Sequence, residues 1–287
     1  MSDEEAKPAG TGTLYVVATP IGNLEDITLR ALRVLKEVPV IAAEDTRTAQ
    51  HLLTHFEIAR PTIVSFFEGN EVGRTEHLLA RLRGGDDVAV ISEAGTPGIS
   101  DPGAHLVAAA VAAGIRVVPI PGPSAVITAL VASGLPSDSF HFVGFAVREG
   151  GPRLQALAKL RTIEATLVFY EAGNRTASTL QDLVGVLGST RRAVVARELT
   201  KIHEELARGT LEELAQRFVE TAPRGEVTIV VEGAAPSAVE AAVDVEAEVK
   251  RRLAGGESPK EIAAALALVS GKPKRQIYQL AVALKRD

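Results

Sequence analysis

Carboxylate side chains recur in short loops that also hold glycine and proline. The longest of these loops reads SEAGTPGISDPG, and another reads EDTRT. Their acids and that of a third loop are Glu44, Asp45, Glu68, Glu93 and Asp101. Arg47 is the only base among them. Such loops repel di- and triphosphates, so they indicate a site for a neutral or cationic ligand, with carboxylates available to accept a proton.

The chain has no signature of an ordinary nucleotide site. It has no Walker lysine and no GxGxxG run after a predicted strand. S-adenosylmethionine fits the loops better, since it carries a sulfonium and an ammonium and no phosphate. Backbone groups near glycines and helix N-termini can meet its adenine and carboxylate. The chain contains no cysteine, and its sequence has no cluster with metal-ligand spacing, so we expect no metal.

The loops follow short apolar runs that predict five strands, at 14–18, 38–43, 62–66, 87–92 and 115–120. Helical patterns lie between them, and this alternation predicts a parallel sheet covered on both faces. The loops themselves are 19–23, 44–48, 67–70, 92–103 and 121–125. Ligands bind beyond the carboxyl ends of parallel strands, so we expect these loops to meet on one rim. Simple helix capping by Asn23 and by Asp101 before Pro102 is the structural alternative.

A second set of strands is predicted at 140–145, 165–172, 192–199 and 226–233, again with helices between. The chain therefore divides into an N-terminal α/β domain, 13–121, and a C-terminal α/β domain, 122–235. Residues 1–12 read as a disordered tail without the features of a signal peptide. The apolar runs are too short to span a bilayer. With no cysteine, these features fit a cytoplasmic protein.

Three short helices are predicted after the last strand, in residues 246–287. Ser258 before Pro259 suits a helix start. This tail has nine Lys and Arg against five Asp and Glu, a net charge of +4, whereas the whole chain carries −5. The rest of the chain is therefore acidic.

Six segments occur in one order along the chain: ATPIGNLEDITLRALRVL, EDTRTAQHLL, SEAGTPGISDPG, PIPGPSAVITALVASGL, FYEAGNR and RELTKIHEE. Together they resemble the tetrapyrrole methylase superfamily of S-adenosylmethionine-dependent enzymes, over roughly residues 12–285. Within it, they are most similar to the methyltransferases of small-subunit ribosomal RNA. The resemblance implies two α/β domains with a cofactor cleft between them, usually in a homodimer. It also implies methyl transfer to the ribose 2′-hydroxyl of a decoding-centre cytidine in the 16S rRNA of the 30S subunit.

By motif position, the resemblance implies cofactor contacts at Pro20, Ala94, Gly95, Thr96, Asp101, Gly122, Ser124, Ala125 and Tyr170. One segment departs from the family pattern FYES-P-HR. It reads Gly173-Asn174 where Pro-His is usual, although Arg175 is kept. A role for a histidine there is therefore excluded in this chain. Glu93 stands where Asp is common, which keeps the charge.

Methyl transfer is an in-line displacement at the sulfonium carbon, so positioning is the main task of the enzyme. A ribose hydroxyl is a poor nucleophile, and some group should accept its proton. The candidate catalytic residues are Glu44, Asp45, Arg47, Glu93 and Glu171, with His203 as a further possible base. Arg47 pairing with Asp45 or Glu44 is the structural alternative.

Two other functions remain open at this point. One is methylation of a small molecule, such as a corrin or siroheme precursor, by the same superfamily. The other is a nucleic-acid-binding regulator that uses the helical tail as a helix-turn-helix. An acidic body that binds RNA needs positive charge from elsewhere. We therefore interpret 246–287 as a helical RNA-docking module with contacts at Lys272, Lys274 and Arg275, and a structural buttress is the alternative.

Overall fold

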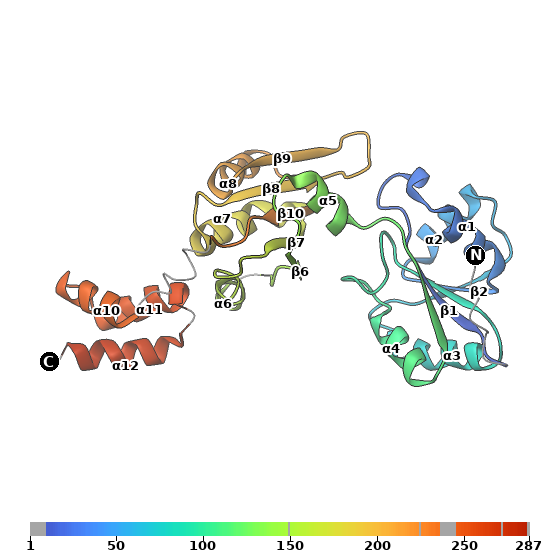
Figure 1. Ribbon diagram of the computed structural model, residues 1–287, viewed down its shortest axis with the longest axis horizontal. Coiled ribbons are helices and arrows are strands. Elements are labelled where there is room, and N and C mark those ends of the chain that lie inside the picture. Colours follow the sequence, from blue (N-terminus) through green and yellow to red (C-terminus); the bar gives the residue numbers. More distant parts are fainter. Residues whose placement is uncertain (1–9, 149, 224, 236–244, 271, 286–287) are drawn as a thin grey trace. The chain divides into compact units, whose positions relative to one another are not determined.

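The computed structural model describes residues 10–148, 150–223, 225–235, 245–270 and 272–285 (Figure 1). They form two compact units. Unit 1 contains the described residues up to Thr128 together with Leu199–His203. Unit 2 contains Ala129–Glu198 and the described residues from Glu204 onward.

Unit 1 is built on a parallel sheet with the strand order β3-β2-β4-β1-β5. The strands are β1 (Thr13–Val17), β2 (Val40–Ala43), β3 (Thr62–Ser65), β4 (Val88–Ile91) and β5 (Arg116–Ile120). The helices are α1 (Leu29–Glu37), α2 (Thr46–His55), α3 (Glu71–Arg83) and α4 (Ala104–Ala112), with a short 3-10 helix, η1 (Leu24–Asp26). The five strands expected here and their parallel arrangement are confirmed.

The two faces of this sheet enter two different cores. On β1, Leu14 packs in the core that holds the apolar side chains of α3 and α4. Val17, on the opposite face of the same strand, packs with those of α1 and α2. Figure 1 shows the two helix pairs on either side of the sheet. Burial on both faces explains why the strands read as continuous apolar runs.

Unit 2 is built on a mixed sheet with the order β6-β7-β10-β8-β9, in which only β6 and β7 are parallel. The strands are β6 (Phe140–Phe145), β7 (Thr166–Ala172), β8 (Arg192–Arg197), β9 (Glu205–Thr210) and β10 (Glu226–Val231). The helices are α6 (Gly151–Ala158), η2 (Gly173–Arg175), α7 (Thr176–Leu187) and α8 (Leu211–Glu220). One core joins α6, α7 and α8 to a single face of the sheet. The helix α5 (Ala125–Ser133) begins in unit 1 and ends in unit 2.

Of the two helix caps considered from the sequence, the structure contains the one at Asn23 but not the one at Asp101. Asn23 caps η1, through the N–H of Glu25, while Thr28 caps α1. Asp101 is not the cap of α4, because that helix begins at Ala104 after Gly103. The N–H of Gly98 donates to the carbonyl of Pro102 at 3.2 Å. The chain before α4 is therefore a closed turn, and the helix starts only where this turn ends.

The tail contains the three expected helices, α10 (Val245–Ala254), α11 (Pro259–Ser270) and α12 (Lys274–Leu284). Their inward residues form a small core of their own, which includes Val249, Ile262 and Ile277. Ser258 exchanges hydrogen bonds with Glu261 at the start of α11, which confirms the predicted cap.

At the other end of the chain, residues 1–9 of the expected disordered segment lie outside the described residues, and the N–H of Gly12 donates to Leu82. Among the described helices, none combines the length and the apolar character that crossing a bilayer needs.

Candidate functional site

The loops after β1 and β4 are joined by a two-way backbone bridge. The N–H of Thr19 donates to Gly95 at 2.8 Å, and the N–H of Gly95 donates back at 3.0 Å. The Thr19 hydroxyl also reaches the carbonyl of Ser92. These contacts follow from the sheet order, because β1 and β4 are hydrogen-bonded neighbours. The loops that hold Pro20 and Ala94 therefore form one surface.

The loop after β5 joins the same surface from the other side of β1. The Thr96 hydroxyl donates to the carbonyl of Pro123 at 3.2 Å. At Gly122, a side chain would place its Cβ 3.0 Å from the Cβ of Ala18, so this loop needs a glycine to lie against β1. Ser124 follows, and its carbonyl accepts the first helical bond of α5, from Thr128. The N-terminal end of α5 thus opens onto the rim.

Carboxylates join the loops after β2 and β3 to the loop after β4. Glu44, after β2, accepts the N–H of Glu93 at 3.1 Å. Glu71, at the start of α3 after β3, accepts the N–H of Gly103 at 3.1 Å. The structure therefore brings all five loops of the predicted rim together. We call this surface, formed by residues 18–23, 44–48, 67–71, 92–103 and 121–125, the loop rim.

The loop after β4 has an unusual backbone. Four of its residues adopt positive φ angles: Gly95 at 80°, Gly98 at 82°, Ser100 at 63° and Gly103 at 130°. Three of the four are glycines, the residue type that adopts this conformation without steric cost. The side chains of Glu93 and Ala94 are exposed beside them. A ligand at this loop would meet backbone groups rather than long side chains.

Asp45 forms an ion pair with Arg47 and caps helix α2. Asp45 caps the helix by accepting the N–H groups of Arg47 and Thr48. These bonds, first that from Thr48 and then that from Arg47, lower the pKa of Asp45. The Arg47 guanidinium lies 3.3 Å from the same carboxylate and is otherwise exposed. A carboxylate held ionised in this way is a weak proton acceptor.

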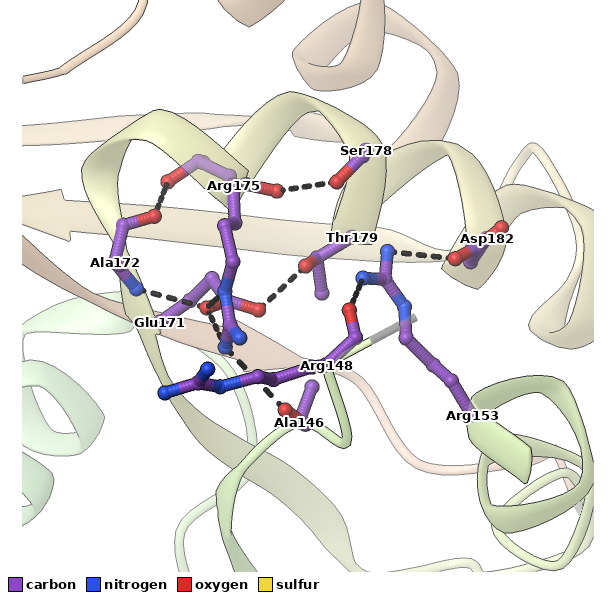
Figure 2. Close-up of polar contacts among 10 residues, drawn as sticks. Ala146, Arg148, Arg153, Glu171, Ala172, Arg175, Ser178, Thr179 and Asp182 are labelled. Carbon is purple, nitrogen blue, oxygen red and sulfur yellow. Dashed lines mark hydrogen bonds and ion pairs between the residues drawn. The ribbon is translucent and has the colours of Figure 1, made fainter. Parts of the chain in front are cut away.

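In unit 2, Glu171 is fully buried at the end of β7. Figure 2 shows its carboxylate among three partners. One oxygen accepts from the N–H of Ala172 and from the Arg175 guanidinium, and the other accepts from the Thr179 hydroxyl at 2.5 Å. We therefore assign Glu171 to holding Arg175 rather than to proton transfer. Tyr170, the preceding residue, packs its ring against Phe142 and Phe145.

The departure from the family pattern at Gly173 has a structural reason. The N–H of Gly173 donates to the carbonyl of Gly225 at 2.7 Å. A Cβ at this position would lie 2.1 Å from the carbonyl oxygen of Pro223. In this chain, the segment before β10 comes so close that only glycine fits. A proline there would also lack the donated N–H.

Comparisons with known proteins agree with this geometry. The family model of tetrapyrrole (corrin/porphyrin) methylases matches residues 13–215. The chain belongs to the tetrapyrrole methylase family. The chain is 46% identical, over 96% of its length and 99% of the relative, to "Ribosomal RNA small subunit methyltransferase I" of Synechocystis sp.. The protein of the same name from Escherichia coli O157:H7 is 45% identical over 98% of this chain and 99% of the relative.

A solved structure is also similar to this chain. It is uroporphyrin-III C-methyl transferase from Thermus thermophilus, complexed with S-adenyl homocysteine. The TM-score is 0.53 and the identity 25%, over 76% of this chain and 97% of that one. The expected fold, two α/β domains of tetrapyrrole methylase type, is confirmed.

The predicted site residues fall into three groups. The loop rim of unit 1 carries most of them: Pro20, Glu44, Asp45, Arg47, Glu93, Ala94, Gly95, Thr96, Asp101, Gly122, Ser124 and Ala125. Unit 2 carries Tyr170 and Glu171 on β7, and Lys272, Lys274 and Arg275 in its tail. Their roles stay predictions. Thr19 lies in the predicted loop 19–23, and its bonds to Gly95 and Ser92 support the rim. Sequence reasoning missed Glu71, whose bond to Gly103 joins the loop after β3 to the rim.

Proposed function

We propose that this protein transfers a methyl group from S-adenosylmethionine to the ribose 2′-hydroxyl of a decoding-centre cytidine in 16S rRNA, within the small ribosomal subunit. The observation that carries the proposal is similarity over almost the whole chain. The relatives named for ribosomal RNA cover 96–98% of it, and so include the tail helices. The tetrapyrrole enzyme covers only 76%. The family model likewise ends at residue 215, before the tail.

The loop rim fits S-adenosylmethionine in charge. Its acids suit a ligand with a sulfonium and an ammonium, and Ala94 and Gly122 are exposed on it. The free N–H groups at the start of α5 suit the carboxylate of the methionine part. The cofactor supplies the methyl group. Among the described residues, no group of His, Cys, Asp and Glu is arranged to hold a metal.

Glu93 is the candidate proton acceptor that the rim favours. Its side chain is exposed, and its backbone is fixed by the bond from its N–H to Glu44. Asp45 is held ionised by its capping bonds. Glu171 is buried with its oxygens occupied. Glu93 is therefore the acid best able to meet a substrate hydroxyl.

The tail helices supply the positive charge for RNA in this proposal. Lys272, Lys274 and Arg275 stand at the start of α12 and are exposed. The inward side of α12 packs in the tail core through Ile277 and Ala281. Basic side chains on the outer side are free to meet phosphates. We also propose that the protein forms a homodimer, which light scattering of the purified chain tests.

The decisive experiment measures methyl transfer from labelled S-adenosylmethionine to 30S subunits from a strain that lacks this gene. Mass mapping of the rRNA should then show one modified cytidine, with the methyl on the ribose. A tetrapyrrole precursor and free duplex DNA serve as competing substrates. Methylation of the tetrapyrrole, or binding of nucleic acid without turnover, would favour one of the two alternative functions instead. The metal-free site is tested separately, by calorimetry of S-adenosylmethionine binding to the protein alone in the presence of a chelator, and loss of that binding would contradict it.

A further inference from the structure

The loop after β6 in unit 2 is held at two of its carbonyl groups by arginines. Arg175 donates to the carbonyl of Ala146 at 3.3 Å. Arg153 donates to the carbonyl of Arg148 at 2.9 Å. Figure 2 shows both arginines reaching the loop from different helices. The loop carries no regular secondary structure, so these bonds fix the backbone where a helix or strand does not.

Each of the two arginines has its own carboxylate. Arg175 is bound by Glu171, whose exposure is 0%. Arg153, which is 1% exposed, lies 2.6 Å from Asp182 on α7. Buried charges are costly unless they are paired. Each ion pair has one fully buried member, and the arginine of each pair also donates to the loop after β6. The loop is therefore held in one position by two costly buried interactions, which indicates a functional reason for that position.

The held loop presents one unpaired cation. Arg148 is exposed, and its guanidinium has no hydrogen-bond or ion-pair partner among the described residues. Figure 2 shows its side chain extending away from Arg153, with no contact drawn at its end. The charges of Arg175 and Arg153 are balanced by Glu171 and Asp182. Arg148 is thus the side chain that gives this cluster its positive charge.

The position of Arg148 relates it to the site. It follows β6, which runs parallel to β7 with Phe145 opposite Tyr170. The carboxyl ends of the two strands therefore lie at one edge of the sheet. Tyr170 lies at that same end of the sheet, and Glu171 follows it on β7.

We propose that Arg148 binds a backbone phosphate of the RNA substrate, an inference that rests on the proposed function. A guanidinium offers a planar pair of donors that matches a phosphate. A loop already fixed by two ion pairs loses little freedom on binding, and this preorganisation favours affinity. The interaction adds a phosphate site in unit 2 to the one proposed in the tail.

The test compares Arg148→Gln with Lys159→Gln, a matched control. Lys159 is exposed at the other end of α6 in the same unit, and its loss changes the net charge equally. Binding of each variant to 30S subunits is measured over a range of salt concentrations. We expect Arg148→Gln to weaken binding by about 5–10-fold at low salt and to flatten the salt slope by about one unit. Affinity for S-adenosylmethionine and the unfolding temperature should stay at wild-type values.

Two further variants separate charge from position. Arg148→Lys keeps the charge, so it should keep the salt slope while losing part of the affinity. Asp182→Asn leaves Arg148 intact but loosens the loop, so it should weaken binding with an unchanged slope. If Arg148→Gln binds subunits as Lys159→Gln does, the proposed phosphate site is wrong. If the wild-type protein neither binds nor methylates subunits, the proposed function is wrong, and the phosphate site that rests on it is wrong as well.

Discussion

Gly95 and Gly122 serve the loop rim for different physical reasons. Gly95 has a φ of 80°, a conformation that costs other residues about 1–2 kcal/mol. Gly122 has no such angle, but a side chain on it would press on Ala18. The first glycine shapes the loop, and the second allows two segments to touch.

We expect Gly95→Val to abolish methyl transfer while the protein stays folded, because a β-branched residue resists this φ. Gly122→Val should have the same effect by pushing its loop away from β1. A methyl-transfer assay with 30S subunits measures the loss of activity of each variant, calorimetric titration measures its affinity for S-adenosylmethionine, and circular dichroism shows whether it is folded. Gly73→Ala is the control, since this glycine lies in α3 with open space around it. Wild-type turnover in a folded Gly95→Val protein would contradict the assigned cradle.

Asp45 makes the stability of unit 1 depend on pH in the acid range. Its pKa is lowered from 3.8 by the N–H groups of Thr48 and Arg47. A lowered pKa stabilises the fold above the ordinary value, and this contribution is lost as the pH falls through the lowered value.

We therefore expect Asp45→Asn to be less stable than wild type at pH 7 and to lose less stability on acidification from pH 5 to pH 3. Asparagine still caps the helix, so the difference isolates the charge. Urea unfolding at each pH measures it. Parallel curves for the two proteins would show that the capping bonds do not shift this pKa.

At this scale the sequence predicted which residue types form the rim, but not how they are paired. The spacing of Glu171 and Arg175 permits an ion pair. It does not reveal that the carboxylate is buried, because burial depends on β10 and on the residues before it. The tight approach at Gly173 likewise comes from residues about fifty positions away in the chain.

Strands and helices were mostly predictable, because their apolar periodicity is strong. The exception is β9, which reads ELARGT and has only two apolar residues, Leu206 and Ala207. It is an edge strand that pairs only with β8. The hydrogen bonds to β8 make this segment a strand, although its composition does not predict one.

This unexpected strand carries a residue that supports α5. Arg208 donates to the carbonyl of Ala132 at 2.5 Å and to that of Ser133 at 3.2 Å. Both belong to the last turn of the helix, where carbonyl groups lack helical partners and a cation is favoured. The start of the same helix, at Ala125, belongs to the loop rim.

We expect Arg208→Gln to lower stability by about 1 kcal/mol, since one cation and its carbonyl bonds are lost at an exposed site. Affinity for S-adenosylmethionine should fall slightly, because α5 frays at one end and carries rim residues at the other. Thermal unfolding and calorimetric titration measure the two effects. Arg60→Gln is the control, as another exposed arginine. Unchanged stability would mean that solvent already satisfies these carbonyl groups.

For the whole molecule, the proposed role of the basic tail predicts that RNA binding can be weakened without loss of cofactor binding. Replacing Lys272, Lys274 and Arg275 with Gln should leave folding and S-adenosylmethionine affinity intact. It should weaken binding to 30S subunits and flatten the salt slope, by roughly one unit for each phosphate that the variant no longer neutralises.

The matched control replaces three bases of α10, Lys250, Arg251 and Arg252. These already form ion pairs with Glu246 and Glu248 in the same helix, so they have less free charge to offer. The control should change the salt slope less than the α12 variant does. Equal effects from both variants would show that the tail acts through its total charge. Wild-type slopes in the α12 variant would make the tail a structural element.

The separate core of the tail helices bears on how the protein melts. All the buried residues of that core come from α10, α11 and α12. So small a core stabilises a fold only weakly, and a segment of low local stability opens before the rest of a protein. Heating should therefore melt the tail in a transition of its own, before the α/β units lose their structure. RNA affinity should decline with temperature earlier than cofactor affinity does, which makes substrate capture the more heat-sensitive step of the reaction.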